Sequence, residues 1–384
     1  MQTIFFKNIL FSIYEVGLFL LKIKALYNSV LNRNSFINPL RVRKILVVKF
    51  YGIGNMVLFT PVLKRLRKKM PGVKIVLYTN SKALEVIKGT NYYDDAILLE
   101  NTQKLKKFRA EYYRFINKIR QENFDMIFFS FPLEANWLIP ILGITGSKYL
   151  IGYNTSDHKA YFTHYLEWDK QKHEVVLNFE LLGLLISGPL TESLDLRLNK
   201  KEKNDAEKYM KTLNSSFEKI VVIHPGGSSA MPERRWPASN YIELIRKILD
   251  AYKCLVICIG SDDESELLKM LKNPFEENVR ILENSFSLRE IAAIIGKCNL
   301  FIGNDSGPMH LAAAVKTPVI ALFGITNSQK SKPWGNHKKV IVINKGLACS
   351  PCYTFNDKVV CKEYSCIKSI TILEVYRAVM LILK

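Results

Sequence analysis

Four residues suited to phosphate binding lie within six positions of one another, between two apolar runs in the stretch 298–324. They are Asp305, Ser306, Gly307 and His310. The stretch predicts a strand, a turn, a helix from 310 to 315 and a second strand at 319–323, with Asp305 or Ser306 as the helix cap. Free N–H groups and the positive end of the helix dipole would then face a bound phosphate. The alternative is an ordinary capped helix with His310 as a capping or core residue.

A second polar group follows the strand predicted at 220–224 and its glycine turn at 225–227. Ser228 and Ser229 can donate hydrogen bonds to phosphate oxygens, and Arg234 or Arg235 can reach a diphosphate across a cleft. The alternative is a pair of solvated surface arginines. The two groups together predict a site for a phosphorylated ligand.

The sequence resembles the bacterial heptosyltransferase family, the ADP-heptose:lipopolysaccharide transferases and their relatives. The resemblance rests on four segments: GNDSGPMHLAAA with TPVIALFG, VVIHPGGSSAMPERRWP at 221–237, ILVVKFYGIGNMVLFTPVLKRLRKKMP at 45–71, and HEVVLNFELLGLL at 173–185. It runs from about Lys44 to the C-terminus. It implies the two-domain GT-B architecture and a nucleotide-diphosphate sugar, similar to ADP-heptose, as donor.

The same resemblance implies which residues bind the donor. Ser229, Arg234, Asp305, Ser306, Gly307 and His310 match the family's donor-binding positions, with Arg234 where relatives commonly have lysine, and Glu264 matches an acid near the nucleoside. The sequence has no Asp-x-Asp triplet. Because a helix end and an arginine can neutralise a diphosphate, we expect no metal at the reaction centre and no required cofactor.

The catalytic base is where the sequence departs from the family. Characterised relatives carry an aspartate, taken as the base, at the turn after the first strand, whereas this chain has Asn55. An amide cannot accept the proton of the acceptor hydroxyl. Asn55 would then orient the acceptor, and Glu134, after a neighbouring predicted strand, is the candidate base.

Hydrophobic periodicity predicts an α/β chain with two Rossmann-like domains facing across a cleft, and an extra N-terminal helix. The first half opens with a strand at 45–49, a turn at 52–54 and a helix at 55–69, whose residues Lys64, Arg65, Arg67, Lys68 and Lys69 lie away from its apolar face. The second half restarts the pattern with a helix at 201–213. We therefore expect an N-terminal segment at 1–36, an acceptor-binding domain at 40–195 and a donor-binding domain at 196–384.

The charge is strongly positive and unevenly distributed. The chain has 55 basic and 35 acidic residues, a formal net charge of +20, and its first 120 residues carry +17 of it. This charge predicts that the N-terminal half binds an anionic partner. Residues 1–31 are apolar but interrupted by Glu15, Lys22 and Lys24, which favours a helix lying on an anionic membrane surface. A secretory signal and a helix packed on the protein are the alternatives.

Seven cysteines do not make a disulfide framework in a chain of this length, and a reducing cytoplasm fits them. Cys349, Cys352, Cys361 and Cys366 form a separate C-terminal cluster, which either binds zinc or an iron–sulfur cluster, packs a C-terminal lobe, or contains an oxidisable pair.

These observations predict an inverting glycosyltransferase that moves a sugar, a heptose by resemblance, to a lipopolysaccharide core or another anionic, membrane-linked glycan. The predicted location is the inner face of the cytoplasmic membrane, as a peripheral protein. Transfer of another sugar to a surface polysaccharide and a weakly active donor-binding protein remain alternatives. A nucleic-acid binder would fit the charge, but the base-rich helices carry no recognised reading motif, so no nucleic-acid partner is expected.

Overall fold

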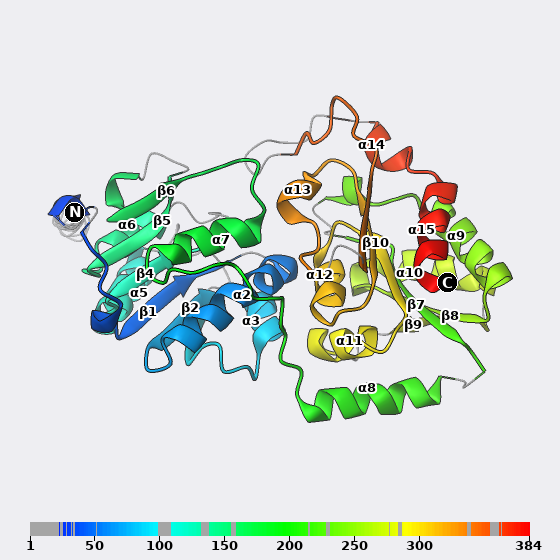
Figure 1. The fold of residues 1–384 in the computed structure, drawn as a ribbon, viewed down its shortest axis with the longest axis horizontal. Coiled ribbons are helices and arrows are strands. Elements are labelled where there is room, and N and C mark those ends of the chain that lie inside the picture. Colours follow the sequence, from blue (N-terminus) through cyan, green and yellow to red (C-terminus); the bar gives the residue numbers. More distant parts are fainter. Residues whose placement is uncertain are drawn as a thin grey trace, which may run out of the picture.

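The computed structural model contains two parallel sheets of six strands each. It describes residues 23, 26–27, 29–31, 33, 35–50, 52–98, 109–131, 138–154, 159–213, 216–227, 231–275, 277–282, 286–335, 339–353, 361 and 363–384. Figure 1 shows the sheets in two separate halves, with helices packed around each. Each sheet has an apolar cluster on both faces, as expected for parallel strands that helices cover.

The first sheet has the strand order β3-β2-β1-β4-β5-β6. Its strands are β1 (Lys44–Val48), β2 (Lys74–Thr79), β3 (Asp95–Leu98), β4 (Met126–Phe129), β5 (Tyr149–Asn154) and β6 (His164–Glu167). The helices of this half are α2 (Ile53–Lys69), α3 (Ser81–Ile87), α5 (Arg109–Gln121), α6 (Leu138–Gly143) and α7 (Glu174–Gly183), with short 3₁₀ turns η1 (Pro39–Arg41) and η2 (Lys159–Tyr161).

The second sheet has the order β12-β11-β10-β7-β8-β9. Its strands are β7 (Lys219–His224), β8 (Cys254–Ile259), β9 (Val279–Leu282), β10 (Leu300–Asn304), β11 (Val319–Phe323) and β12 (Val340–Asn344). Its helices are α8 (Lys200–Thr212), α9 (Ala238–Ala251), α10 (Ser265–Lys272), α11 (Leu288–Ile295), α12 (Gly307–Ala314), α13 (Ser328–Ser331), α14 (Ser365–Lys368) and α15 (Ile372–Leu383), with 3₁₀ turns η3 (Pro232–Arg234), η4 (Asp262–Glu264) and η5 (Asn273–Phe275).

Both sheets have the same topology. Counted from the first strand of its own half, each sheet has the order 3-2-1-4-5-6, the dinucleotide-fold order. This confirms the α/β class and the two Rossmann-like domains. The boundary between residues 195 and 196 falls in the connection from α7 to α8, and we keep the division into 1–36, 40–195 and 196–384 as a proposal.

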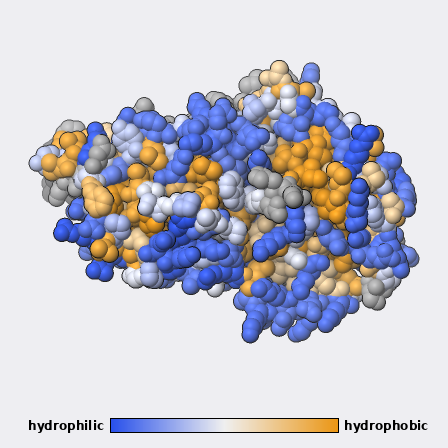
Figure 2. Space-filling model, viewed as in Figure 1, coloured by the Kyte–Doolittle hydropathy of each residue, from blue (hydrophilic) through white to orange (hydrophobic). Residues whose placement is uncertain are grey.

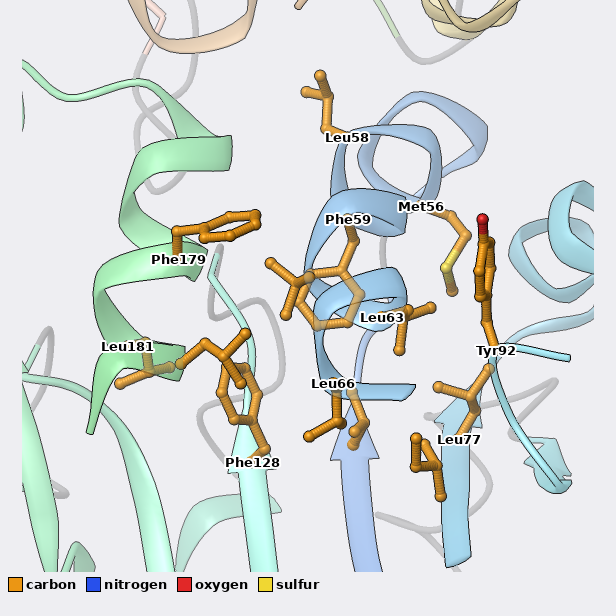
Figure 3. Close-up of a cluster of buried hydrophobic side chains, with 14 of the residues drawn as sticks. Met56, Leu58, Phe59, Leu63, Leu66, Leu77, Tyr92, Phe128, Phe179 and Leu181 are labelled. Atoms are coloured by element: carbon orange, nitrogen blue, oxygen red, sulfur yellow. The ribbon is translucent and has the colours of Figure 1, made fainter. Parts of the chain in front are cut away.

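Helix α2 is the centre of the first half because it is buried almost all round. Figure 3 shows Met56 on the side of Tyr92, while Leu58 points away from the cluster. The ring centroids of Phe59 and of Phe128 of β4 lie 6.1 Å apart. Each fully buried side chain of this size contributes roughly 1.5–3 kcal/mol to the stability of the fold. The predicted helix is confirmed, although it begins at Ile53 rather than Asn55.

One residue that the sequence places away from the apolar face of this helix is buried. Arg65 is 4% exposed and ion-pairs with Glu192, with 2.5 Å between Nε and Oε1. Its guanidinium also lies over the ring of Phe179. The connection after α7 covers this side of the helix, and a local sequence pattern does not predict that contact.

The two halves contact each other through α3 and α11. Arg289 of α11 donates to the carbonyl oxygens of Val86, Leu196 and Arg197 and forms an ion pair with Glu202. On the other side, His173 Nε2 lies 2.9 Å from Lys332 O, and its ring packs against Trp334. The halves are thus joined at both sides of the cleft.

The described part of the N-terminal segment is helical at residues 23, 26–27 and 29–31, at the far end of the first half (Figure 1). Ser29 is buried and donates to Ala160 O at 2.6 Å, whereas Tyr27, Val30 and Leu31 are each more than 60% exposed. No helix in the described ranges is long and apolar enough to cross a membrane. Residues 1–22 lie outside the described part.

Figure 2 shows a largely hydrophilic face, with the polar helix α8 at its lower edge. Several bases among the first 120 residues are in ion pairs with acids further along the chain, including Lys44 with Glu122 and Lys49 with Glu174. The net charge of a segment therefore overstates the charge it offers to a partner.

Candidate active site

A cavity of about 1060 Å³ lies between the two halves, at the carboxyl ends of both sheets. Its wall includes Gly54 and Asn55 after β1, Phe131 after β4, and Asp305 after β10. These positions flank the points where the strand order reverses in each sheet, β1 beside β4 and β7 beside β10. Ligands of open α/β sheets bind in such crevices.

Two helices begin at the floor of this cavity and point their N-termini toward each other. A Cβ atom on Gly307 of α12 would lie 2.9 Å from Ile53 Cβ of α2, and a Cβ on Gly54 would lie 2.5 Å from His310 Cδ2. Only glycine permits this approach. Neither helix start has a side-chain cap within the described residues, so first-turn N–H groups of both remain available to an anion.

The prediction that Asp305 or Ser306 caps α12 is therefore wrong for the side chains. Ser306 occupies the N-cap position, but its Oγ lies 3.1 Å from Asn304 O and 3.0 Å from His224 Nδ1. The hydroxyl therefore bonds to the end of β10 and to His224 rather than to the first turn of α12. Pro308 lies in the first turn as predicted.

Arg234 and Asp305 are brought together at the cavity. Arg234 Nη1 is 3.2 Å from Asp305 Oδ2, and its guanidinium lies over the ring of Tyr353. Burial raises the pKa of Asp305, and the charge of Arg234 opposes that shift. Arg234 Nε is buried and has no hydrogen-bond partner among the described residues. The ion pair with Asp305 holds the guanidinium of Arg234 at the cavity wall, where it can donate to a ligand.

His310 is buried in the first turns of α12 and faces the same space. Desolvation, together with the charge of His173, lowers its pKa to about 3, so the imidazole is neutral at pH 7. Its Nδ1 is buried without a partner in the described part of the chain. A buried, unpaired ring nitrogen in a cavity wall is suited to a hydrogen bond with a ligand.

Glu264 lines the cavity, and backbone groups hold its carboxylate. Its carboxylate accepts from Gly227 N at 2.7 Å and Ser261 N at 2.8 Å, and a Cβ on Gly226 would lie 1.7 Å from Oε1. Burial tends to raise its pKa, but His224 and these donors outweigh burial and lower it to about 2. Glu264 lines the cavity while fixing the glycine loop after β7.

The other predicted donor residues are placed as follows. Arg235 donates to Gly227 O at 3.1 Å and lies 3.8 Å from Glu264 Oε1, so it braces the loop. Ser228, Ser229 and Glu134 lie outside the described residues, and their assignments stay predictions.

Asn55 lines the cavity opposite the donor loops and is bound to a carboxylate. Its Nδ2 donates to Glu174 Oε2 at 2.6 Å, and Lys49 Nζ donates to Glu174 Oε1 at 2.8 Å. Glu174 is itself part of the cavity wall. Sequence analysis missed Lys49 and Glu174 as site residues, although each stands in a segment with the family resemblance.

Sequence analysis also missed a cationic rim. Lys170, after β6, and Lys330, on α13, line the cavity, and their Nζ atoms lie 5.6 and 5.4 Å from the ring centroid of Trp168. Burial and the charge of Lys170 lower the pKa of Lys330. Two cations on one ring, one from each half, would be stabilised by an anion between them.

The seven cysteines are all free thiols. Burial raises the pKa of Cys366, and the thiols of Cys349, Cys352 and Cys361 add to the shift. Among the described residues no group of three or more His, Cys, Asp or Glu side chains is arranged to hold a metal ion, and 354–360 lie outside them. A metal in this cluster stays a prediction, to be checked by metal analysis of the purified protein.

Two Rossmann-like domains with a cavity between their switch points define a GT-B type of protein, and comparison with known proteins agrees. The family model for glycosyltransferase family 9 (heptosyltransferase) matches residues 112–362. The chain belongs to this family and is a glycosyltransferase.

Individual relatives are distant. The chain is 25% identical over 308 residues to lipooligosaccharide heptosyltransferase 2 of Campylobacter jejuni, covering 78% of this chain and 86% of the relative. It is 24% identical to lipopolysaccharide heptosyltransferase 3 of Escherichia coli, covering 74% of this chain and 84% of the relative.

Solved structures show the same fold. ADP-heptose lipopolysaccharide heptosyltransferase II of E. coli superposes with a TM-score of 0.69 at 20% identity, covering 88% of this chain and 98% of that one. A family 9 glycosyltransferase from Veillonella parvula superposes with a TM-score of 0.72 at 21% identity, covering 92% of this chain and 99% of that one.

Proposed function

We propose that this glycosyltransferase transfers heptose from ADP-heptose to a lipopolysaccharide core or a related membrane-linked glycan, with inversion at the anomeric carbon. The observation that carries the proposal is the pair of helix N-termini, α2 and α12, which meet at the cavity floor beside Arg234. A diphosphate that departs there gains negative charge where N–H groups and a guanidinium are already oriented.

The arrangement of the cavity supports inversion. The donor groups, Arg234 and His310, belong to one half, while Asn55 and Glu174 belong to the other. In a single displacement the acceptor oxygen and the leaving diphosphate lie on opposite sides of the anomeric carbon. Two walls from two domains suit that geometry.

We infer the kind of acceptor from the charge at the cavity and from the exposed apolar surface of the first half. Lys170 and Lys330 flank Trp168 at the cavity, which suits phosphate or carboxylate groups on the acceptor. At the far end of the first half, Phe36 and Leu40 are both 83% exposed beside the exposed N-terminal helix. We propose that this end contacts an anionic membrane on its inner face, where the enzyme acts as a peripheral protein.

The test is donor binding and transfer by the purified enzyme. ADP-heptose should raise the midpoint of thermal unfolding more than UDP- or GDP-sugars do, because a ligand at about 100 times its Kd adds roughly 2.7 kcal/mol. Transfer to a heptose-deficient lipopolysaccharide core should follow. Stabilisation by another nucleotide sugar alone would favour a different donor, and binding without transfer would favour a weakly active protein.

Variants locate the donor site. Arg234→Ala and His310→Ala should each weaken ADP binding by about 10–100-fold in calorimetric titration, because each removes a hydrogen-bond donor from a buried anion site. Arg246→Ala is the matched control, since Arg246 is exposed and pairs with Glu243 on the surface of α9. Equal ADP affinity in all four proteins would remove this assignment.

A further inference from the structure

The buried network of Lys49, Glu174 and Asn55 holds a carboxylate at the acceptor side of the cavity. Glu174 is the first residue of α7, and its side chain is 5% exposed. Lys49 follows β1, has a fully buried side chain, and donates to Phe131 O at 2.6 Å as well as to Glu174. The carboxylate is thus fixed from two sides.

This network is more than a structural ion pair. A buried pair of opposite charge often contributes little net stability, because desolvation offsets the attraction. Here the third member, Asn55, stands at the cavity wall in the first turn of α2. Its amide nitrogen donates to Glu174 Oε2, so the carboxylate held at this turn is that of Glu174.

We propose that Glu174 is the general base of the transfer reaction, with Asn55 and Lys49 as its positioning residues; this rests on the proposed function. One oxygen of the Glu174 carboxylate accepts the proton of the acceptor hydroxyl. The acceptor oxygen bonds to the anomeric carbon, and the bond from that carbon to the diphosphate breaks, with its electron pair leaving on the diphosphate. The charge of Lys49 favours the ionised form of the carboxylate.

The environment of Glu174 agrees with this role. Burial raises its pKa, and Lys49 and Asn55 oppose the shift. A carboxylate with raised pKa is a stronger base than an exposed one. The network also explains the amide at position 55. An aspartate there would place two carboxylates in hydrogen-bond contact, and only one of them could stay ionised.

The acid at position 174 and the amide at position 55 are hydrogen-bonded partners. A charge-neutral exchange of the two is therefore the decisive variant. In Asn55→Asp/Glu174→Gln, the amide of residue 174 can donate to the new carboxylate and its carbonyl can accept from Lys49. Hydrogen-bond count and net charge are both kept.

The experiment compares wild type, Glu174→Gln, the double variant and the control Glu180→Gln, with ADP-heptose and a heptose-deficient core as substrates. Glu180 lies on the same helix but is exposed and pairs with Lys172. Glu174→Gln should lower kcat by about 10²–10⁴, with ADP affinity changed less than threefold. The double variant should recover at least tenfold over Glu174→Gln, and Glu180→Gln should match wild type.

The pH profile gives an independent readout. Wild-type kcat should fall at acid pH as Glu174 is protonated, and Glu174→Gln should lack that fall. If Glu174→Gln keeps the wild-type kcat, the base role alone is overturned. The same holds if Glu174→Gln loses both kcat and ADP binding and the double variant does not recover kcat. Absence of transfer by the wild type overturns the proposed function and the base role together.

Discussion

At the scale of single residues, the carboxylates near the cavity have opposite surroundings. Glu264 accepts two backbone N–H groups and has a lowered pKa, whereas Asp305 is buried beside one arginine and has a raised pKa. Hydrogen bonds to the charged form dominate in the first case and desolvation in the second. The first carboxylate stabilises a loop, and the second is harder to ionise than an exposed aspartate.

Glu264 should make stability depend on pH in the acid range. Its pKa falls from 4.5 to about 2 on folding, so its contribution is present above pH 4.5 and is lost as pH falls toward 2. The shift corresponds to at most ~3 kcal/mol. Glu264→Gln should lower the midpoint of thermal unfolding at pH 7, and the difference from wild type should shrink toward pH 2.

The control for this measurement is Glu266→Gln, two residues further along and exposed, with a partner in Lys269. It should unfold like wild type at every pH. A constant difference between Glu264→Gln and wild type from pH 7 to pH 2 would contradict the assignment of the lowered pKa.

At the scale of elements, the site depends on the close approach of the N-termini of α2 and α12. Gly54 and Gly307 stand where α2 and α12 touch, and both have room only for hydrogen on that side. Because Ala has a higher helix propensity than Gly, any loss on substitution must come from contact across the floor rather than from the helix itself.

Gly307→Ala should push α12 away from Ile53 and lower ADP affinity at least tenfold, together with the midpoint of thermal unfolding. The matched control is Gly183→Ala at the end of α7, where no described heavy atom lies within 4 Å of an added Cβ. That variant should be neutral or more stable by up to ~1 kcal/mol. Calorimetry with ADP and thermal unfolding measure both effects, and equal behaviour of the two alanines would count against the close approach.

The sequence predicted these elements well because their signals are local. Apolar runs, glycine turns and Pro308 each act within a few residues, so strands, helices and the donor loop could be placed in order. The partners of Asn55 and Arg65 are Glu174 and Glu192, which lie 119 and 127 residues away in the sequence. Contacts between residues so far apart in the sequence are decided by tertiary packing, and the local spacing of residues does not predict them.

At the scale of the whole molecule, the cleft between the halves has a basic rim. Lys170 and Lys330 come from different halves but share the ring of Trp168. Lys170→Ala and Lys330→Ala should each raise KM for an anionic acceptor by about 3–30-fold and leave ADP affinity unchanged, because each removes one charge from the acceptor side. Steady-state kinetics at two salt concentrations measure this.

Lys297→Ala serves as the control for those kinetics, since Lys297 is exposed and lies 3.7 Å from Glu207. It should leave KM unchanged. A loss of ADP affinity in the Lys170 or Lys330 variants would place that lysine at the donor instead.

The N-terminal end should carry the contact with membranes. Val30→Ser/Leu31→Ser should reduce binding to anionic vesicles in sedimentation, as should deletion of residues 1–36, because both remove exposed apolar surface. Wild-type binding should fall as salt rises. Leu381→Ser is the control, since Leu381 is 66% exposed at the other end of the chain. Equal binding to neutral and anionic vesicles would contradict the electrostatic part.

Two contacts at the joint between the halves are made to main-chain oxygens. Arg289 binds the carbonyl of Val86, and His173 binds that of Lys332. Every residue type offers a carbonyl, so substitutions at positions 86 and 332 leave these two contacts intact. The halves can diverge separately at these points, and a hybrid enzyme that takes its first half from a relative should acquire that relative's acceptor while keeping this chain's donor. Transfer assays on such a hybrid measure how modular the enzyme is.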